Sequence, residues 1–283
     1  MVSRMKDRVC VITGGNGGIG RATALELARR GATVVLVCRS RERGEEAQRT
    51  IRSETKNDAV ELVIADLASL ADVRRAAAEI LARHSKIHVL INNAAVFLPK
   101  REVSADGFEK TFATNYLSHF LLTHLLLGAL KAGAPSRIIN VATKTMGLKI
   151  DFDNLMLEKG YSILKAVGPT KLALILFTQK LAAELAGSGV TVNALHPGLV
   201  KTGLLDDSPW LMRTLFGLIS TTPEKGARTS VYLATSDEVA SVSGKLFADC
   251  KPIAAKGQAQ DPAAVDKLWQ LSLQMTKLDA RAP

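Results

Sequence analysis

A glycine-rich turn near the N-terminus constrains the fold of this 283-residue chain more than any other feature. The apolar, β-branched run Val9–Thr13 stops at the turn. An amphipathic helical pattern follows from about Ile19 to Arg30, and a second apolar run covers Thr33–Val37. A strand, a glycine turn, a helix and another strand in this order predict a β-α-β unit.

The glycines of this turn point to a bound diphosphate. Gly14, Gly18 and Gly20 would let the backbone come close to the phosphates, and the following helix N-terminus offers free N–H groups and a positive dipole end. A purely structural turn is the alternative, but the strand–turn–helix context is the one that dinucleotide binding requires. We therefore expect the turn residues to contact a dinucleotide, namely Gly14, Asn16, Gly18, Ile19 and Gly20.

Composition excludes several classes of protein. The chain is 47% hydrophobic and 23% charged, which suffices for a large buried core. No apolar run reaches the ~20 residues of a membrane span, so we expect no stable membrane insertion. The start MVSRMKDRV enters the first strand without a signal-peptide pattern, and we expect a cytoplasmic protein. Three scattered cysteines, Cys10, Cys38 and Cys250, predict neither a disulfide framework nor a metal site.

The net charge of +10 raises the question of nucleic-acid binding. The basic residues, however, are interleaved with acids along the helical patterns, as in Arg41-Glu42-Arg43. The sequence has no basic tail and no basic patch with interleaved aromatic residues. We expect a solvated surface that attracts anionic ligands, and no nucleic-acid partner.

Apolar runs and helical patterns alternate along the whole chain. The runs that predict strands are Val9–Thr13, Thr33–Val37, Val60–Ala65, Ile87–Asn92, Arg137–Ala142, Val190–Leu195 and Lys245–Ala248. Helical patterns lie near 19–30, 41–54, 69–84, 105–131 and 170–187, with a last one from Pro262 to about Lys277. Continuous apolar strands between helices indicate a parallel sheet covered on both faces. We predict an α/β fold: one doubly wound Rossmann-type domain over 1–283, with a mostly parallel seven-stranded sheet.

Ligands of such folds bind beyond the carboxyl ends of the strands. After the second strand, Arg39 stands roughly 20 residues past the glycines, where an NAD site usually has an acid. A guanidinium there suits the 2′-phosphate of NADP, and a surface arginine opening a charged helix is the alternative. The turns Asp66-Leu67 and Asn93-Ala94 follow the next strands and could contact adenine and ribose, although Asp66 could equally cap a helix.

The chain resembles the short-chain dehydrogenase/reductase family over its whole length. The motifs that carry the resemblance are Thr13-Gly14-xxx-Gly18-Ile19-Gly20, Asn92-Asn93-Ala94, Asn115 and Pro197-Gly198. The segments 115–120 and 243–251 are similar to the retinol-dehydrogenase-like branch. The resemblance implies that Asp66 and Asn93 contact the adenosine half of the cofactor. It further implies that Pro197, Gly198, Val200 and Thr202 flank the nicotinamide.

The family's chemistry uses an Asn, a Ser, a Tyr that exchanges the proton, and a Lys that tunes the Tyr and holds the nicotinamide ribose. Asn115 matches the Asn, and Thr143 stands in the place of the Ser. Two frames compete for the Tyr and Lys. Tyr161 and Lys165 have the literal spacing, but Lys171 matches without a gap to Pro197-Gly198. We favour the second frame, which puts Val167, a residue with no proton to transfer, where the tyrosine belongs.

Pro169 bears on the same choice. It lacks the N–H that the Lys165 carbonyl would need, so we expect the Lys171 helix to start near Pro169, with Tyr161 and Lys165 on the preceding loop. Tyr161 could still swing in as a substitute acid, or it could simply pack. Thr143 acting through a water, Lys144 or an acidic group of the substrate are other candidates. The predicted catalytic set is therefore Asn115, Thr143, Lys171 and Tyr161.

The segment 203–222 carries apolar residues, including Trp210 and Phe216, and corresponds to the family's substrate lid. It would suit a hydrophobic small-molecule substrate, although packing on the core or on a second subunit fits the pattern equally well. Family helices near 112–130 and 170–186 commonly pair subunits, which implies a homodimer or homotetramer. Two functions remain: an NADP(H)-dependent oxidoreductase with an atypical proton donor, or a dinucleotide-binding fold repurposed for non-redox chemistry, sensing or partner binding.

Overall fold

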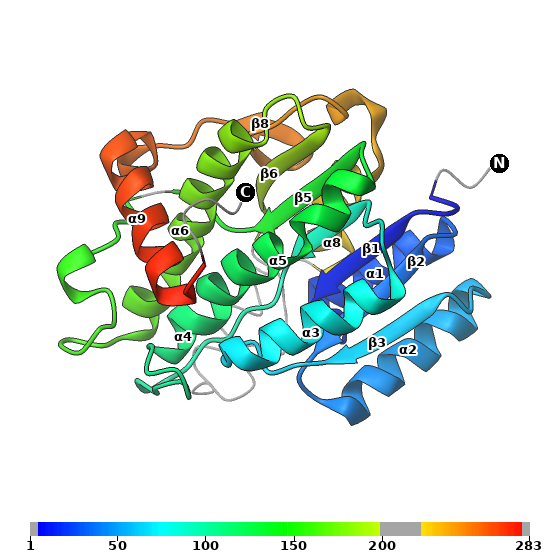
Figure 1. The fold of residues 1–283 in the computed structure, drawn as a ribbon, viewed down its shortest axis with the longest axis horizontal. Coiled ribbons are helices and arrows are strands. Elements are labelled where there is room, and N and C mark those ends of the chain that lie inside the picture. Colours follow the sequence, from blue (N-terminus) through cyan, green and yellow to red (C-terminus); the bar gives the residue numbers. More distant parts are fainter. Residues whose placement is uncertain (1–4, 146, 199–221, 279–283) are drawn as a thin grey trace.

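A computed structural model describes residues 5–145, 147–198 and 222–278. They form one twisted sheet in the order β3-β2-β1-β4-β5-β6-β7-β8, with helices on both faces (Figure 1). The strands are β1 (Val9–Thr13), β2 (Thr33–Cys38), β3 (Val60–Ile64), β4 (Val89–Asn92), β5 (Ser136–Val141), β6 (Val190–His196), β7 (Leu246–Ala248) and β8 (Lys251–Ile253). All pairs are parallel except β7 with β8. The predicted doubly wound, mostly parallel fold is thus confirmed.

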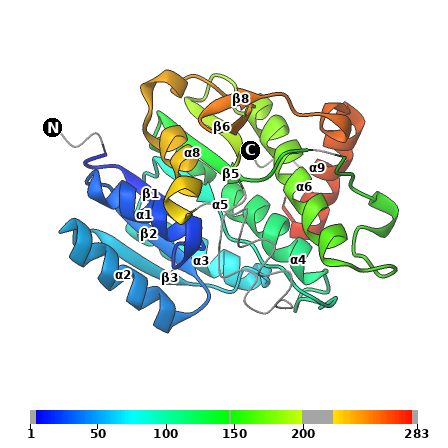
Figure 2. The ribbon, with the colours of Figure 1, turned by 180° about the vertical axis from the view of Figure 1, so that it is seen from behind.

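Helices cover the sheet in two layers, which Figure 1 and Figure 2 show from opposite sides. The helices are α1 (Gly18–Arg29), α2 (Arg41–Thr55), α3 (Leu70–Arg83), α4 (Lys110–Phe112), α5 (Ser118–Ala132), α6 (Ile163–Glu184), α8 (Pro223–Thr235) and α9 (Pro262–Thr276). Helices α1, α2 and α8 bury one face of the sheet, and α3, α5, α6 and α9 bury the other. Successive β1 residues, Cys10, Val11 and Ile12, alternate between the two cores, as the period of a strand requires.

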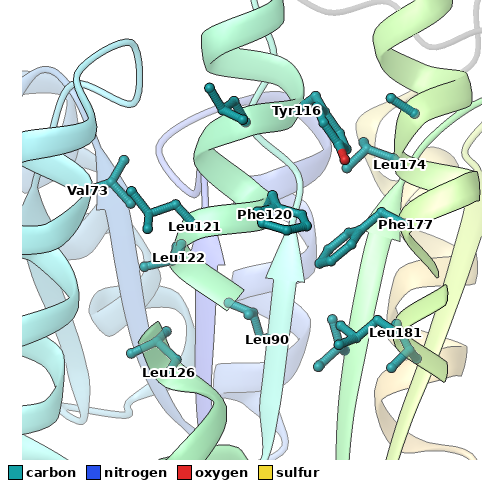
Figure 3. Packing of buried hydrophobic residues seen from close by; sticks show 14 of the residues in the cluster. Val73, Leu90, Tyr116, Phe120, Leu121, Leu122, Leu126, Leu174, Phe177 and Leu181 are labelled. Carbon is teal, nitrogen blue, oxygen red and sulfur yellow. The ribbon is translucent and has the colours of Figure 1, made fainter. Parts of the chain in front are cut away.

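Aromatic side chains fill the core between α5, α6 and α9. Phe120 lies 5.2 Å from Phe177 and 5.3 Å from Trp269 between ring centroids. Tyr116 packs on the same group and is fully buried (Figure 3). This packing joins α5, α6 and α9 on one face of the sheet.

The sheet has eight strands, and the prediction of seven was wrong. The eighth strand, β8, returns antiparallel to β7 through a tight turn in which Asp249 and Cys250 both have positive φ, 48° and 62°. Two such residues make the tight connection of a hairpin, but a cysteine gives no sequence signal for it. Pro252 lies within β8, where proline is tolerated because β8 is at the sheet edge.

The start of α6 also differs from the prediction. The helix begins at Ile163 rather than near Pro169, because the Ser162 hydroxyl caps it by accepting from the Lys165 backbone N–H at 3.3 Å. Lys165 therefore lies on the helix and not on a loop, whereas Tyr161 does precede the helix. Pro169 removes one hydrogen bond to the Lys165 carbonyl, on an exposed residue where water can replace it.

Gly20 offers a direct test of the packing at the glycine turn. A Cβ added to Gly20 would lie 2.2 Å from the Gly14 carbonyl oxygen and 2.6 Å from Nδ2 of Asn93. We expect Gly20→Ala to lower the free energy of unfolding by roughly 3 kcal/mol, as overpacking of a tight contact does. Chemical denaturation measures the effect.

Gly128→Ala is the matched control, because a Cβ on this exposed α5 residue meets nothing within 4 Å. Alanine there should leave stability unchanged or raise it by up to about 1 kcal/mol. Equal stability of the two variants would contradict the close approach of Gly20 to Gly14.

Candidate active site

The carboxyl ends of β1, β4, β5 and β6 meet at one edge of the sheet. The register pairs Ile12 of β1 with Ile91 of β4, and Val141 of β5 with Leu195 of β6. The residues that follow these strands are therefore brought together from four distant parts of the chain. This edge is where a doubly wound fold binds its ligand.

The glycine turn leaves backbone N–H groups open at the start of α1. Gly14 and Gly18 adopt left-handed φ angles of 68° and 48°, which bend the chain between strand and helix. Gly17 caps α1 without a side-chain hydrogen bond to the first-turn N–H groups, so these donors have no capping side chain. Asn16 and Ile19 lie beside these glycines in the turn and the first helical residues. The cradle fits a dinucleotide diphosphate.

Thr13 and Asn93 hold the glycine turn in place through hydrogen bonds. The Thr13 Oγ1 accepts hydrogen bonds from the backbone N–H groups of Asn93 at 2.9 Å and Ala94 at 3.0 Å. The Asn93 side-chain amide donates in return to the Thr13 carbonyl at 2.9 Å. The amide nitrogen of Asn93 thus holds β1 and β4 in place at the site.

Two arginines lie at the far rim of the turn. Arg39 is exposed directly after β2. The Arg43 guanidinium reaches to 4.0 Å from the position that a Cβ on Gly17 would take. The sequence indicated Arg39 and missed Arg43, whose only signal was its place one helical turn further along.

The turn after β3 is shaped by Asp66. Its Oδ1 accepts from the Ala68 backbone N–H at 3.0 Å, and the neighbouring Leu67 is buried. Ser69, not Asp66, caps α3, because its hydroxyl accepts from the Asp72 N–H. The helix-cap alternative for Asp66 is therefore wrong.

Asn115 lies in the middle of a π-helical segment, Ala113–Leu117, between α4 and α5. Its side-chain Oδ1 accepts from the Val96 N–H at 2.7 Å, and its Nδ2 donates to the Val96 carbonyl at 3.0 Å. The amide is held from both ends by the loop that follows β4. π-Helical turns are frequent at functional sites, where they place one residue out of the regular helical pattern.

His119 forms hydrogen bonds to both Asn115 and Thr13, and the sequence analysis did not predict this role. Its Nδ1 lies 3.2 Å from the Asn115 carbonyl, which only accepts, so Nδ1 carries the proton. Complete burial, and next the charge of Lys171, lower the pKa of His119 to about 3, so the ring is neutral. Its Nε2 therefore accepts from the Thr13 hydroxyl at 3.1 Å.

Lys171 projects from α6 into the buried interior behind the site. Its Nζ donates to the Val141 carbonyl at 2.7 Å, at the end of β5. Burial lowers the pKa of Lys171 to about 8. Val167 is also buried, and it lies one helical turn before Lys171, on the same face of α6.

Thr143 has a neighbour that the sequence analysis did not select. Its Oγ1 lies 3.3 Å from Nδ1 of His196, the last residue of β6. Burial and the charge of Lys144 lower the pKa of His196, while the charge of Asp249 opposes them. Both side chains are partly exposed at the edge of the sheet.

The hydroxyls of the three tyrosines are all engaged elsewhere. Tyr161 donates to the Leu98 carbonyl at 2.8 Å, and partial burial raises its pKa. The Tyr116 hydroxyl pairs with Ser272 at 2.7 Å in the core (Figure 3). Tyr232 donates to Glu238 at 2.8 Å.

The predicted nicotinamide side of the site begins directly after β6. Pro197 and Gly198 directly follow β6, as the sequence indicates. Val200, Thr202 and the expected lid at 203–222, except Thr222, lie outside the described residues. Within the described ranges, no helix is long and apolar enough to cross a membrane, and no group of acidic, His and Cys side chains could hold a metal ion.

Comparisons with known proteins agree with this geometry. The family model for short chain dehydrogenases matches residues 8–209. Human retinol dehydrogenase 14 is 45% identical, with 97% of this chain and 88% of the relative covered, and human retinol dehydrogenase 13 is 44% identical, with 96% and 86% covered.

Among solved structures, an uncharacterised protein from Mycobacterium paratuberculosis superposes with a TM-score of 0.78 at 34% identity, covering 96% of this chain and 94% of that one. RhlG of Pseudomonas aeruginosa in complex with NADP gives a TM-score of 0.71 at 25% identity, covering 87% and 96%. The chain belongs to the short-chain dehydrogenase family and is an oxidoreductase.

Proposed function

We propose that the protein is an NADP(H)-dependent oxidoreductase acting on a hydrophobic carbonyl or alcohol, with a proton donor other than the family's tyrosine. The observation that carries the proposal is the glycine cradle after β1, with Arg39 after β2 and a buried Lys171 bound to the end of β5, at the carboxyl ends of one parallel sheet. The relatives are named retinol dehydrogenases, and retinol is a lipophilic alcohol. It supports a substrate of the same chemical class.

The residues present fit an NADP cofactor. Gly14, Gly18 and Gly20 with the uncapped start of α1 would hold the diphosphate, and Arg39 and Arg43 would face the 2′-phosphate. Asp66, Leu67, Asn93 and Ala94 would lie along the adenosine half, and Lys171, Pro197, Gly198, Val200 and Thr202 along the nicotinamide half. When bound, the dinucleotide supplies or accepts the hydride.

A cleft with a mixed apolar and charged lining lies next to the helix that carries Lys171. It has a volume of about 400 Å³ and opens beside the first turns of α6. Apolar side chains line it, among them Phe112, Leu148 and Leu155, together with charged ones such as Asp151 and Lys165. A lipophilic substrate in this cleft would contact the apolar part of the lining.

The atypical step is the proton transfer. Val167 occupies the α6 position from which a side chain would share the face of Lys171, and valine has no hydroxyl. Hydride transfer depends chiefly on the placement of cofactor and substrate, so the loss of the tyrosine slows the reaction without abolishing it. Asn115, Thr143 and Lys171 would then hold the site, and Tyr161 would need to leave Leu98 to act as an acid.

The sequence pattern predicts a cytoplasmic protein, and the family resemblance implies a homodimer or homotetramer. Both stay predictions. Size-exclusion chromatography with light scattering measures the oligomeric state, and fractionation of expressing cells measures the location.

Cofactor preference tests the role of Arg39. We expect Arg39→Asp to weaken NADPH binding roughly 10- to 100-fold, because a charge-assisted contact to the 2′-phosphate becomes a repulsion. Affinity for NADH should be unchanged or improved. Titration by intrinsic fluorescence or calorimetry gives both dissociation constants. Arg49→Asp, an equally exposed arginine further along α2, controls for net charge, and equal losses in both variants would remove Arg39 from the site.

A tyrosine placed at position 167 tests the proposal that Val167 stands where the family carries its proton-donating tyrosine. We expect Val167→Tyr to raise the rate of NADPH oxidation with aromatic or long-chain aldehydes, retinal included, about 100-fold, as a positioned general acid does. Val167→Phe is the matched control, since it adds the ring without the hydroxyl. An equal gain from phenylalanine would show that bulk, not proton transfer, is responsible. If no carbonyl changes NADPH absorbance in any of the three proteins, the oxidoreductase proposal fails.

The charge state of Lys171 is measurable without cofactor. We expect its ammonium group to titrate near pH 8 in the free protein, because burial lowers its pKa from 10.5. The lysine is therefore cationic below that pH and increasingly neutral above it. Side-chain NMR of isotope-labelled lysine, assigned with Lys171→Met, follows the titration. A Lys171 pKa near 10.5 would contradict the buried position.

A further inference from the structure

We infer that Thr143 and His196 together form the proton relay that replaces the missing tyrosine. In this relay, the Thr143 hydroxyl gives its proton to the substrate oxygen, and the His196 imidazole replaces that proton on Thr143. The inference rests on the proposed function and assigns to His196 a role that the sequence motifs did not suggest.

The topology places these two residues side by side. Thr143 follows β5, and His196 ends β6, the neighbouring strand in the sheet. Val141 pairs with Leu195 in the register, so the chain segments just beyond them run next to each other. The Thr143 Oγ1 and the His196 Nδ1 lie 3.3 Å apart, within hydrogen-bond distance.

Three other proton-bearing groups near the site, Lys171, Tyr161 and His119, are held away from a substrate. The Lys171 Nζ is buried and donates to the Val141 carbonyl at 2.7 Å. The Tyr161 hydroxyl donates to the Leu98 carbonyl at 2.8 Å. His119 is fully buried, and both of its nitrogens are occupied, by Asn115 and by Thr13. Thr143, by contrast, is partly exposed, and its hydroxyl partner is a titratable ring.

The proton balance of the relay is closed. In the reducing direction, the Thr143 Oγ1–H bond breaks and a new O–H bond forms on the substrate oxygen. At the same time the Nδ1–H bond of cationic His196 breaks and the proton passes to Thr143. His196 becomes neutral and takes up a proton from solvent, to which it is partly exposed. A threonine alone is too weak an acid for this step, which is why the ring beside it is needed.

The surroundings of His196 set the pH dependence. The charged groups that face it are Lys144, beside Thr143 on the segment after β5, and Asp249, in the β7–β8 turn. Burial and Lys144 together outweigh Asp249 and hold the pKa of His196 below 6.5. The cationic form that can donate a proton therefore grows as the pH falls below neutrality. Reduction should accelerate in that direction, whereas oxidation should need the neutral ring and level off above the pKa.

The decisive variant is His196→Asn, which can still hydrogen-bond to Thr143 but cannot carry a proton. We expect kcat for carbonyl reduction at pH 6 to fall about 100-fold and the acidic rise in rate to disappear. The dissociation constant for NADPH and the melting temperature should stay within twofold and 2 °C, roughly, of the wild type. His196→Ala supplied with free imidazole should regain part of the lost rate, which a purely structural role would not allow.

A second measurement uses the protein without cofactor. Lys144→Ala removes the positive charge nearest His196, so it should raise the pKa of His196 measured by NMR titration of the imidazole. The midpoint of the pH–rate profile should move upward by the same amount. Lys131→Ala is the matched control, because Lys131 is an exposed lysine at the end of α5 that does not act on His196.

The outcomes separate the two proposals. Wild-type activity that persists unchanged in His196→Asn overturns the relay and leaves the proposed oxidoreductase standing. A pH–rate midpoint that does not follow the NMR pKa of His196 in Lys144→Ala also overturns the relay. Wild-type protein that turns over no carbonyl or alcohol overturns the proposed function, and the relay with it.

Discussion

The hydroxyl of Thr13 is the interaction on which the rest of the site depends. Its oxygen accepts the N–H groups of Asn93 and Ala94, and its proton goes to Nε2 of His119, the closer of two acceptors. One atom thus joins the end of β1, the end of β4 and the start of α5. Because all of its hydrogen-bonding capacity is used inside the protein, the glycine turn that follows is held by a fully satisfied network.

Burial then determines what each titratable group of the site can do. His119 is kept neutral, so it serves as a fixed donor and acceptor between Asn115 and Thr13. Lys171 is kept near the point where it changes charge, with one N–H donating to the Val141 carbonyl. His196, at the rim, is partly exposed to solvent, and burial together with the charge of Lys144 lowers its pKa. The interior groups therefore position the site, and the rim group is the one suited to exchange protons.

The sequence correctly predicted most structural features that depend on local residue pattern and on the order of the strands. The glycine turn, the order of strands and helices and the residues at strand ends all follow from periodicity and turn chemistry. The eighth strand was missed because its turn uses Asp249 and Cys250 in left-handed conformations and its strand contains Pro252. The start of α6 was misplaced because the Ser162 cap outweighs the single hydrogen bond that Pro169 removes.

Contacts between distant segments lay beyond the sequence for a different reason. His196 and Thr143 are 53 positions apart, and only the register of β5 with β6 brings them together. His119 is a histidine within an apolar helix, and nothing in its neighbours along the chain names Thr13 as its partner. Sequence periodicity assigns residues to helices and strands. Which side chains contact each other depends on how those helices and strands pack.

In the proposed function, Val167 stands where the family carries its tyrosine, so proton transfer is separated from the helix that carries Lys171. The Thr170 hydroxyl donates to the Val167 carbonyl at 2.7 Å, and Lys171 is bound to β5, so this turn of α6 is fixed whatever side chain position 167 carries. The valine side chain is buried at this position. The cradle that would hold a dinucleotide contains no part of residue 167. In the proposed function the cradle is kept and the tyrosine is absent, and these two features are physically independent. Proton transfer would then fall on a group at the strand ends that combines a transferable proton with access to solvent.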